Sequence, residues 1–133
     1  MIEISKDITN HLPTLVEDYI AEKPELKQLY TNTPKLSSFK NISRDFIYRK
    51  ELIEALKKQT SSTHPSVIKN INLLEKSNTY TVTTGHQLGV FGGPLYFVFK
   101  IISTINLAKK LSAEYPDKNF VPVFWMASED HDK

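Results

Sequence analysis

Apolar and polar residues follow two different rhythms along the 133-residue chain, and the change falls near residue 79. Before it, apolar positions recur at helical spacing between polar breaks, which predicts short helices over residues 1–78. The clearest of them covers Ser43–Gln59, with the Ser43 hydroxyl as a candidate N-cap. The others are Ile8–Ile20, which Pro13 interrupts, Glu25–Tyr30, and a stripe of Val67, Ile68, Ile71 and Leu74.

After residue 79 the pattern becomes that of a strand, a loop, a helix and a second strand. Thr79–Thr84 is β-branched and aromatic, and Phe120–Ala127 is almost wholly apolar, as in a strand covered on both faces. Between them, apolar residues at helical spacing predict a helix that begins with Pro94 and ends near Ser112. This order predicts a βαβ unit, and hence two parallel strands of a Rossmann-like α/β sheet.

The predicted organisation is therefore a helical segment, 1–78, followed by a βαβ unit, 79–133. Two parallel strands are too few for a covered sheet, and the second strand would leave an apolar edge open. We therefore expect this chain to be the N-terminal piece of a longer protein. The alternative is a small complete α/β domain that ends in an acidic tail.

All four glycines of the chain fall within nine consecutive residues, between the first predicted strand and the helix. Average usage of about 7% would supply about nine glycines. A glycine loop before a helix presents backbone N–H groups at the positive helix end, which suits phosphate or carboxylate. The alternative is a tight strand-to-helix crossing that needs positive φ angles. The candidate anion-binding residues in and beside the loop are Thr84, Gly85, Gln87, Gly89, Gly92 and Gly93.

Ionisable side chains follow both predicted strands, and parallel strands open on the same edge of a sheet. His86 comes after the first strand, where it could act as a general base or donate to an anion. The alternative for His86 is a structural hydrogen bond within the loop. Carboxylates after the second strand could bind Mg²⁺, orient an amine or accept its proton, or instead cap a following helix. The candidate catalytic residues there are Asp130, His131 and Asp132, with Glu129 as a candidate for substrate binding.

Other residues that carry chemistry are expected to be structural. Trp125 and Phe124 lie in the apolar run and are expected in the core, and His11 and His64 lie in the helical segment. Lys100 is expected in solvent, with phosphate binding as the alternative. No His, Asp or Glu set has the local spacing of a zinc site, so we expect no metal.

Composition excludes several classes of function. The net charge of +2 gives no electrostatic argument for nucleic acid. The absence of cysteine excludes disulfides and cysteine nucleophiles, and makes the cytoplasm the default location. The N-terminus lacks the pattern of a signal peptide, and no apolar run approaches the roughly 20 residues that span a bilayer. We therefore expect neither nucleic acid nor a membrane as a partner.

Three motifs in order resemble one known family. They are T-G-x-Q-x-G-x-F-x-G-P-L-Y at Thr84–Tyr96, K-x-I-S at Lys100–Ser103 and P-V-F-W-x-A-x-E-D-H-D at Pro122–Asp132. Together they are similar to the BshC family, the cysteine-adding enzymes of bacillithiol biosynthesis. The family's pattern often has glutamine at position 86, which favours a hydrogen-bonding role that His86 shares with Gln87.

The resemblance implies a Rossmann-like core and a C-terminal coiled coil, through which a homo-oligomer is expected. It implies the last step of bacillithiol synthesis, in which an amide bond joins cysteine to glucosamine-malate, the two expected substrates. No cofactor follows from the residues, and only the energetics of amide formation favour ATP. Family members are several times longer, so we expect this fragment alone to be inactive. The alternative is a non-catalytic α/β module that binds an anionic metabolite or nucleotide.

Overall fold

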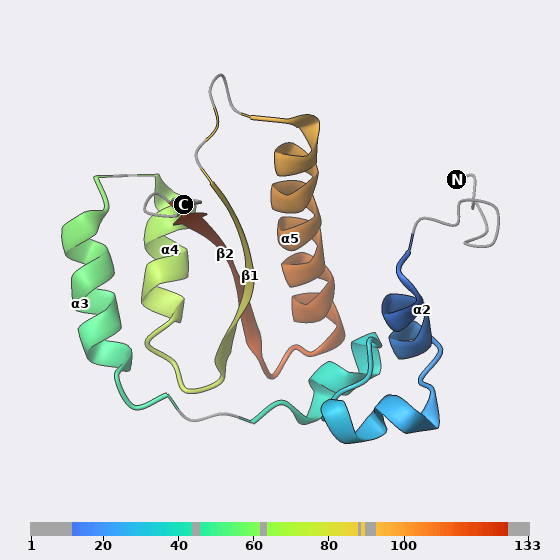
Figure 1. Ribbon diagram of the computed structural model, residues 1–133. Helices are drawn as coiled ribbons and strands as arrows, with labels where there is room; N and C mark the ends of the chain where they lie inside the picture. Colours follow the sequence, from blue (N-terminus) through green and yellow to red (C-terminus); the bar gives the residue numbers. More distant parts are fainter. Residues whose placement is uncertain (1–11, 44–45, 62–63, 88, 90–92, 128–133) are drawn as a thin grey trace. The chain divides into compact units, whose positions relative to one another are not determined.

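The computed structural model describes residues 12–43, 46–61, 64–87, 89 and 93–127 (Figure 1). The chain forms two compact units, one over residues 1–42 and one over residues 43–133. The predicted boundary at residue 78 followed the change of secondary structure, whereas the second unit also includes the two helices that precede the first strand.

The first unit is built from one α-helix and two 3₁₀ helices in its described part. Helix α2 spans Thr14–Ile20, with Pro13 at its N-cap position, so the described part of the predicted Ile8–Ile20 helix begins only after the proline. Helix η1 spans Pro24–Leu29 and lies within one residue of the predicted short helix over Glu25–Tyr30. Helix η2, Leu36–Asn41, has no counterpart among the predicted elements.

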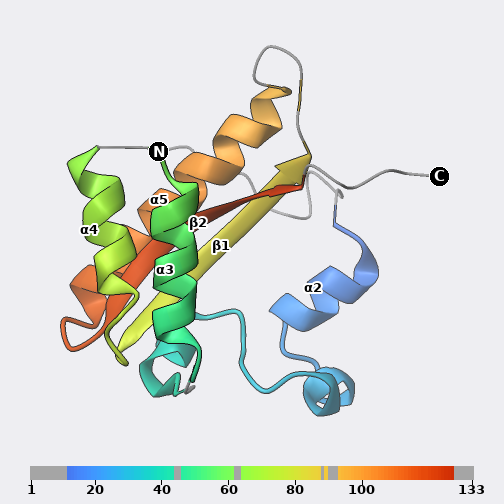
Figure 2. The ribbon, with the colours of Figure 1, turned by 90° about the vertical axis from the view of Figure 1, so that its left-hand side faces the viewer.

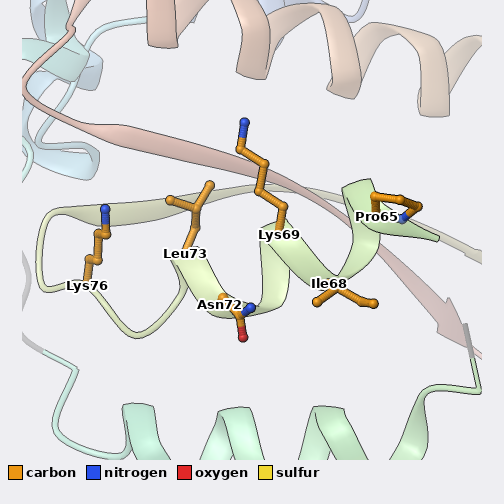
Figure 3. A pocket seen from close by; sticks show the side chains of 6 residues that line it. All are labelled: Pro65, Ile68, Lys69, Asn72, Leu73 and Lys76. Carbon is orange, nitrogen blue, oxygen red and sulfur yellow. The ribbon is translucent and has the colours of Figure 1, made fainter. Parts of the chain in front are cut away.

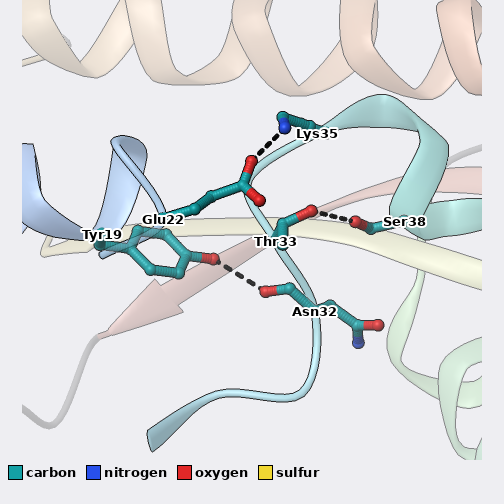
Figure 4. Close-up of polar contacts among 6 residues, drawn as sticks. All are labelled: Tyr19, Glu22, Asn32, Thr33, Lys35 and Ser38. Atoms are coloured by element: carbon teal, nitrogen blue, oxygen red, sulfur yellow. Dashed lines mark hydrogen bonds and ion pairs between the residues drawn. The ribbon is translucent and has the colours of Figure 1, made fainter. Parts of the chain in front are cut away.

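Local polar contacts hold the turns of this first unit (Figure 4). The Tyr19 hydroxyl donates to the Asn32 carbonyl oxygen at 3.2 Å, and the Thr33 and Ser38 hydroxyls lie 2.8 Å apart. Lys35 pairs with the Glu22 carboxylate. Because none of these contacts spans more than 13 positions, they stabilise local structure.

The second unit contains the expected βαβ arrangement. Strands β1, Thr79–Gln87, and β2, Asn119–Ala127, run parallel, and helix α5, Leu95–Glu114, connects them. Helices α3, Arg49–Gln59, and α4, Pro65–Leu73, lie on one face of the strands, and α5 lies on the other (Figures 1 and 2). The predicted parallel α/β topology is therefore confirmed. Within the described ranges, no helix combines the length and apolar character that crossing a bilayer requires.

Apolar side chains pack on both faces of the sheet. On one face the core consists of residues from α3, α4 and β2: Ile53, Ile71, Leu74 and Val121. On the other face α5 buries Thr104, Ala108 and Leu111, and Phe97 packs edge-on against Phe124, with 5.1 Å between the ring centroids. Phe124 is therefore half-buried, as expected of a core residue.

Strand β2 is not covered along its whole length, which corrects one prediction. Trp125 was expected in the core, but 68% of its surface is exposed, and Met126 is exposed as well. Neighbouring elements cover only the first half of β2, where Phe120 and Val121 are buried. An apolar sequence alone does not reveal where the covering helices end.

Several boundaries differ from the predicted ones. Strand β1 continues through Gly85, His86 and Gln87, because each of them pairs in register with a residue of β2. Pro94 lies just before α5, with φ −68° and ψ 156°, and the helix continues to Glu114. Helix α3 begins at Arg49 rather than at Ser43, consistent with the low helix propensity of the aromatic and β-branched residues at positions 46–48.

Other differences concern α4. Within the predicted stripe, Ile71 and Leu74 are buried but Val67 and Ile68 are exposed, and the helix ends at Leu73, one residue before the last position of the stripe. The stripe thus identified the helix correctly and overestimated how much of it is covered.

Hydrogen bonds from Arg49 link the amino end of β1 to the C-terminal end of α4. Its guanidinium donates to the carbonyl oxygens of Leu74, at 2.9 Å, and of Ser77 and Thr79, each at 3.2 Å. The Thr79 hydroxyl donates to the Leu73 carbonyl oxygen at 2.6 Å. Carbonyl groups at a helix C-terminus lack partners within the helix, and these side-chain bonds help to satisfy them in the turn that leads into the sheet.

Two asparagines link the amino ends of the strands to each other. The Asn119 backbone N–H and side-chain amide donate to the carbonyl oxygen and side-chain oxygen of Asn78, each at 3.0 Å. The Asn78 side chain in turn donates to the Asp117 carbonyl oxygen at 2.7 Å. The amino ends of both strands are therefore fixed by side chains as well as by the sheet.

Candidate functional site

The carboxyl ends of β1 and β2 lie side by side, since Gln87 pairs with Ala127 in the parallel register. This edge is where open α/β sheets bind ligands. Of the candidate site residues, Gly92, Glu129, Asp130, His131 and Asp132 lie outside the described residues. Their predicted meeting with His86 at this edge stays a prediction.

Gly85 is required by the close approach of the two strands. A Cβ atom at this position would lie 2.9 Å from the Trp125 carbonyl oxygen and 3.1 Å from the Trp125 Cβ. The first of these distances is shorter than real Cβ contacts allow, so a side chain would push the strands apart. The requirement for glycine at position 85 therefore has a structural cause that is independent of ligand binding.

Lys100 ties helix α5 to the end of β1. Its ammonium donates to the Gly85 carbonyl oxygen and lies 5.2 Å from the centre of the Tyr96 ring. The side chain is half-buried, so the expectation of a solvated lysine is wrong. An ammonium group has three donors, so the bond to Gly85 is compatible with a further contact to an anion.

His86 is half-buried against the first turns of α5. Its ring meets Phe97 edge-on, at 5.7 Å between centroids and 88° between planes, and Tyr96 at 6.3 Å and 67°. His86 Nδ1 lies 2.9 Å from the Gln87 carbonyl oxygen. Because a carbonyl oxygen only accepts, Nδ1 carries the proton there, and in the neutral ring Nε2 is the unprotonated nitrogen. The structural hydrogen bond and a role as base are thus compatible.

Gly93 makes the turn into α5. Its φ angle of +71° lies in the left-handed region, which side chains rarely adopt, so a tight crossing does require glycine here. A Cβ at Gly93 would lie 3.8 Å from the Gly89 Cα, which brings these two glycines close together. Gln87 and Gly89 are both exposed.

Thr84 lies apart from the other candidates. It lines a small cavity between the sheet and α5, together with Ile101, Thr104 and Phe124. The structure thus brings Gly85 and His86 together at the sheet edge and turns Thr84 towards the interior. Sequence reasoning did not assign Tyr96 to the site and gave Lys100 a binding role only as the alternative; their i, i+4 spacing on one helix was the available signal.

A second hollow lies along helix α4, apart from the residues of the candidate site (Figure 3). It is lined by Pro65, Ile68, Lys69, Asn72, Leu73 and Lys76, which belong to α4 and to the turn that follows it. In the described ranges, no three His, Asp or Glu side chains gather closely enough to hold a metal ion. We place the candidate site at the sheet edge, because Gly85, His86 and Lys100 lie there at the carboxyl ends of the parallel strands.

Comparison with known proteins decides the family. A family model described as "Bacillithiol biosynthesis BshC, N-terminal Rossmann-like domain" matches residues 2–133. The chain belongs to the BshC family. The match confirms the Rossmann-like fold class and the family that the motifs indicated.

Curated members of the BshC family resemble the chain over almost its whole length. Proteins named "Putative cysteine ligase BshC" are 48% identical in Flavobacterium psychrophilum and 49% identical in Christiangramia forsetii, each over 97% of this chain. The protein of that name in Bacillus cytotoxicus is 37% identical over 96% of this chain. The chain spans about a quarter of these relatives, 26%, 26% and 24% of their lengths, respectively.

Proposed function

We propose that this chain is the N-terminal part of a ligase that adds L-cysteine to glucosamine-malate in the last step of bacillithiol biosynthesis. The observation that carries the proposal is the match of residues 2–133 to the BshC domain, together with the ligase name of relatives up to 49% identical. The geometry supports it, because the sheet edge presents a histidine, a lysine and a glycine turn where α/β folds bind substrates.

The reaction joins the amine of glucosamine-malate to the carboxyl carbon of cysteine. The carboxylate must first be activated, because it does not condense with an amine unaided; we propose ATP as the source of the activating group. The amine nitrogen then attacks the activated carbon, the leaving group departs with its electron pair, and the nitrogen loses a proton.

His86 is proposed to receive that proton or to orient the amine. With Nδ1 bonded to the Gln87 carbonyl oxygen, Nε2 is the nitrogen that accepts. Asp130, His131 and Asp132 are proposed as the other proton acceptors, and Glu129 as a substrate ligand. The turn at Gly89 and Gly93, before the N-terminus of α5, is proposed to bind a phosphate or carboxylate group.

Lys100 is proposed as a positioning residue for this chemistry. Its bond to the Gly85 carbonyl oxygen holds the residue directly before His86, and its ammonium lies over the Tyr96 ring that also meets His86. Loss of this lysine would therefore change where the imidazole sits.

The test uses the full-length protein with cysteine, glucosamine-malate and ATP, and measures bacillithiol by mass spectrometry. We expect product from the wild type and a loss of roughly 10²-fold or more in turnover for Asp130→Asn, the scale of general-base catalysis. Circular dichroism provides the folding control. Tight binding of malate or ATP by the folded wild type without any product would instead favour the non-catalytic binding module.

A further inference from the structure

Helix α5 has a second apolar face in addition to the one that packs on the sheet. Its inner face carries Thr104, Ala108 and Leu111, which are buried. A separate set of large apolar residues follows i, i+3, i+4, i+7 spacing and therefore occupies one side of the first two turns. This set, here called the outer stripe, consists of Leu95, Val98, Phe99 and Ile102.

The outer stripe is far more exposed than the apolar residues on the inner face of α5. The exposed fraction is 70% for Leu95, 59% for Phe99 and 49% for Ile102, against 0% for Leu111 on the inner face. Contiguous exposed apolar surface of this kind marks an interaction site. A helix that is apolar on both sides is typical of one that is buried on both sides.

The outer stripe ends part-way along the helix. At 100° per residue, the polar residues Asn106 and Lys109 and then the small residue Ala113 continue the line of the stripe, and all three are exposed. On this side of α5 the large apolar side chains are thus confined to the end that begins at the candidate site. A surface that carries only polar and small residues along its second half needs cover only along its first half.

We propose that the outer stripe is the docking surface for another segment of the same polypeptide, one that presents an apolar face. The chain accounts for 26% of the length of the relatives from Flavobacterium psychrophilum and Christiangramia forsetii, so a protein of that size has about three times as much further chain to pack. We propose that this further chain covers the outer stripe.

The proposed segment would also border the candidate site. Tyr96, the neighbour of Leu95, meets the His86 ring at 6.3 Å and lies beside the Lys100 ammonium. A segment seated on the outer stripe would therefore lie beside the candidate site. The docking proposal does not depend on which reaction the site performs.

Thiol accessibility in the full-length protein tests the proposal, since this chain has no cysteine of its own. Phe99→Cys and Ile102→Cys report on the outer stripe, and Ala113→Cys, on the same side of α5, is the matched control. Maleimide labelling is followed by peptide mass spectrometry. We expect the two stripe thiols to react at least about tenfold more slowly than the control in the native protein, and equally fast in denaturant.

Two further measurements identify the occupant. Light scattering gives the oligomeric state, and the labelling is repeated at dilutions where the protein is monomeric. Protection that persists in the monomer supports a segment of the same chain, whereas protection lost on dilution assigns the stripe to a second copy and overturns the proposal. Equal native labelling of stripe and control overturns it as well.

A variant that fails to fold does not end the test. Hydroxyl-radical footprinting of the wild-type full-length protein compares oxidation of Phe99 with that of Trp125, another exposed aromatic residue of the described part. Low oxidation of Phe99 relative to the rate for the unfolded protein supports the docked segment. Oxidation of Phe99 at the unfolded rate contradicts it.

Discussion

The two ends of the same pair of strands are built in opposite ways. At the amino end, Thr79, Phe120 and Val121 are buried, and the side chains of Arg49 and Asn78 bond to backbone carbonyl oxygens. At the carboxyl end Trp125 and Met126 are exposed, and Lys100 bonds the strand end to the helix beside it.

This difference separates the residues that hold the fold from those available for chemistry. In α/β folds the carboxyl edge of the sheet carries the ligand and the opposite edge carries stability. The described part of the chain follows that division. Substitutions at the amino end should therefore change stability and leave turnover per folded molecule unchanged, whereas those at the carboxyl end should lower turnover, with or without a loss of stability.

The largest expected effect on stability is that of Arg49→Ala. The change removes three hydrogen bonds from a charged donor, including the part-buried ones to the Leu74 and Thr79 carbonyl oxygens. We expect the free energy of unfolding to fall by about 2–3 kcal/mol. Urea denaturation of the full-length protein measures it, with Lys50→Ala at the exposed neighbouring position as a control expected within about 0.5 kcal/mol. An unchanged midpoint for Arg49→Ala would show that the three bonds contribute nothing.

A somewhat smaller loss is expected for Gly85→Ala. The added methyl group would meet the Trp125 carbonyl oxygen at 2.9 Å, and overpacking of this kind costs about 1–3 kcal/mol. Because the strands must separate at the candidate site, turnover should fall with stability. Thr83→Ala, at an exposed position two residues earlier on the same strand, is the control. Wild-type stability and turnover in Gly85→Ala would contradict the close approach.

The smallest change in stability is expected for Lys100→Met, which keeps the apolar stem and removes the donor. We expect a loss of about 1 kcal/mol and a several-fold lower kcat with KM nearly unchanged. Lys100→Arg should recover part of kcat, because it restores a charged donor. Lys109→Met, on the same helix and exposed, controls for the loss of charge. Equal kcat in Lys100→Met and the wild type would show that the lysine does not position His86.

Local patterns predicted the βαβ unit because strand and helix periodicities are properties of neighbouring residues. Thr79–Thr84 and Phe120–Ala127 lie within the observed strands, and the helix between them was displaced by only one or two residues at each end. Gly93 adopts a positive φ angle, and a tight crossing that needs such angles was one of the two interpretations of the glycine loop.

Contacts between distant residues could not be predicted in this way. Arg49 reaches carbonyl oxygens 25 to 30 positions away, and no spacing rule connects them. The apolar run of β2 suggested that Trp125 was covered, but cover depends on where α3, α4 and α5 end in space. Gly85 was attributed to loop freedom, whereas its contact with Trp125 arises only once the strands pair.

The most direct test compares His86→Ala with Arg49→Ala in the full-length protein, measuring bacillithiol formation per folded molecule and the thermal midpoint for both. The two-ended account predicts that His86→Ala loses turnover by roughly 10²-fold or more with a midpoint near that of the wild type. It predicts that Arg49→Ala lowers the midpoint and keeps wild-type turnover per folded molecule. Wild-type turnover in His86→Ala, or a turnover loss in folded Arg49→Ala as large as that in His86→Ala, would contradict the account.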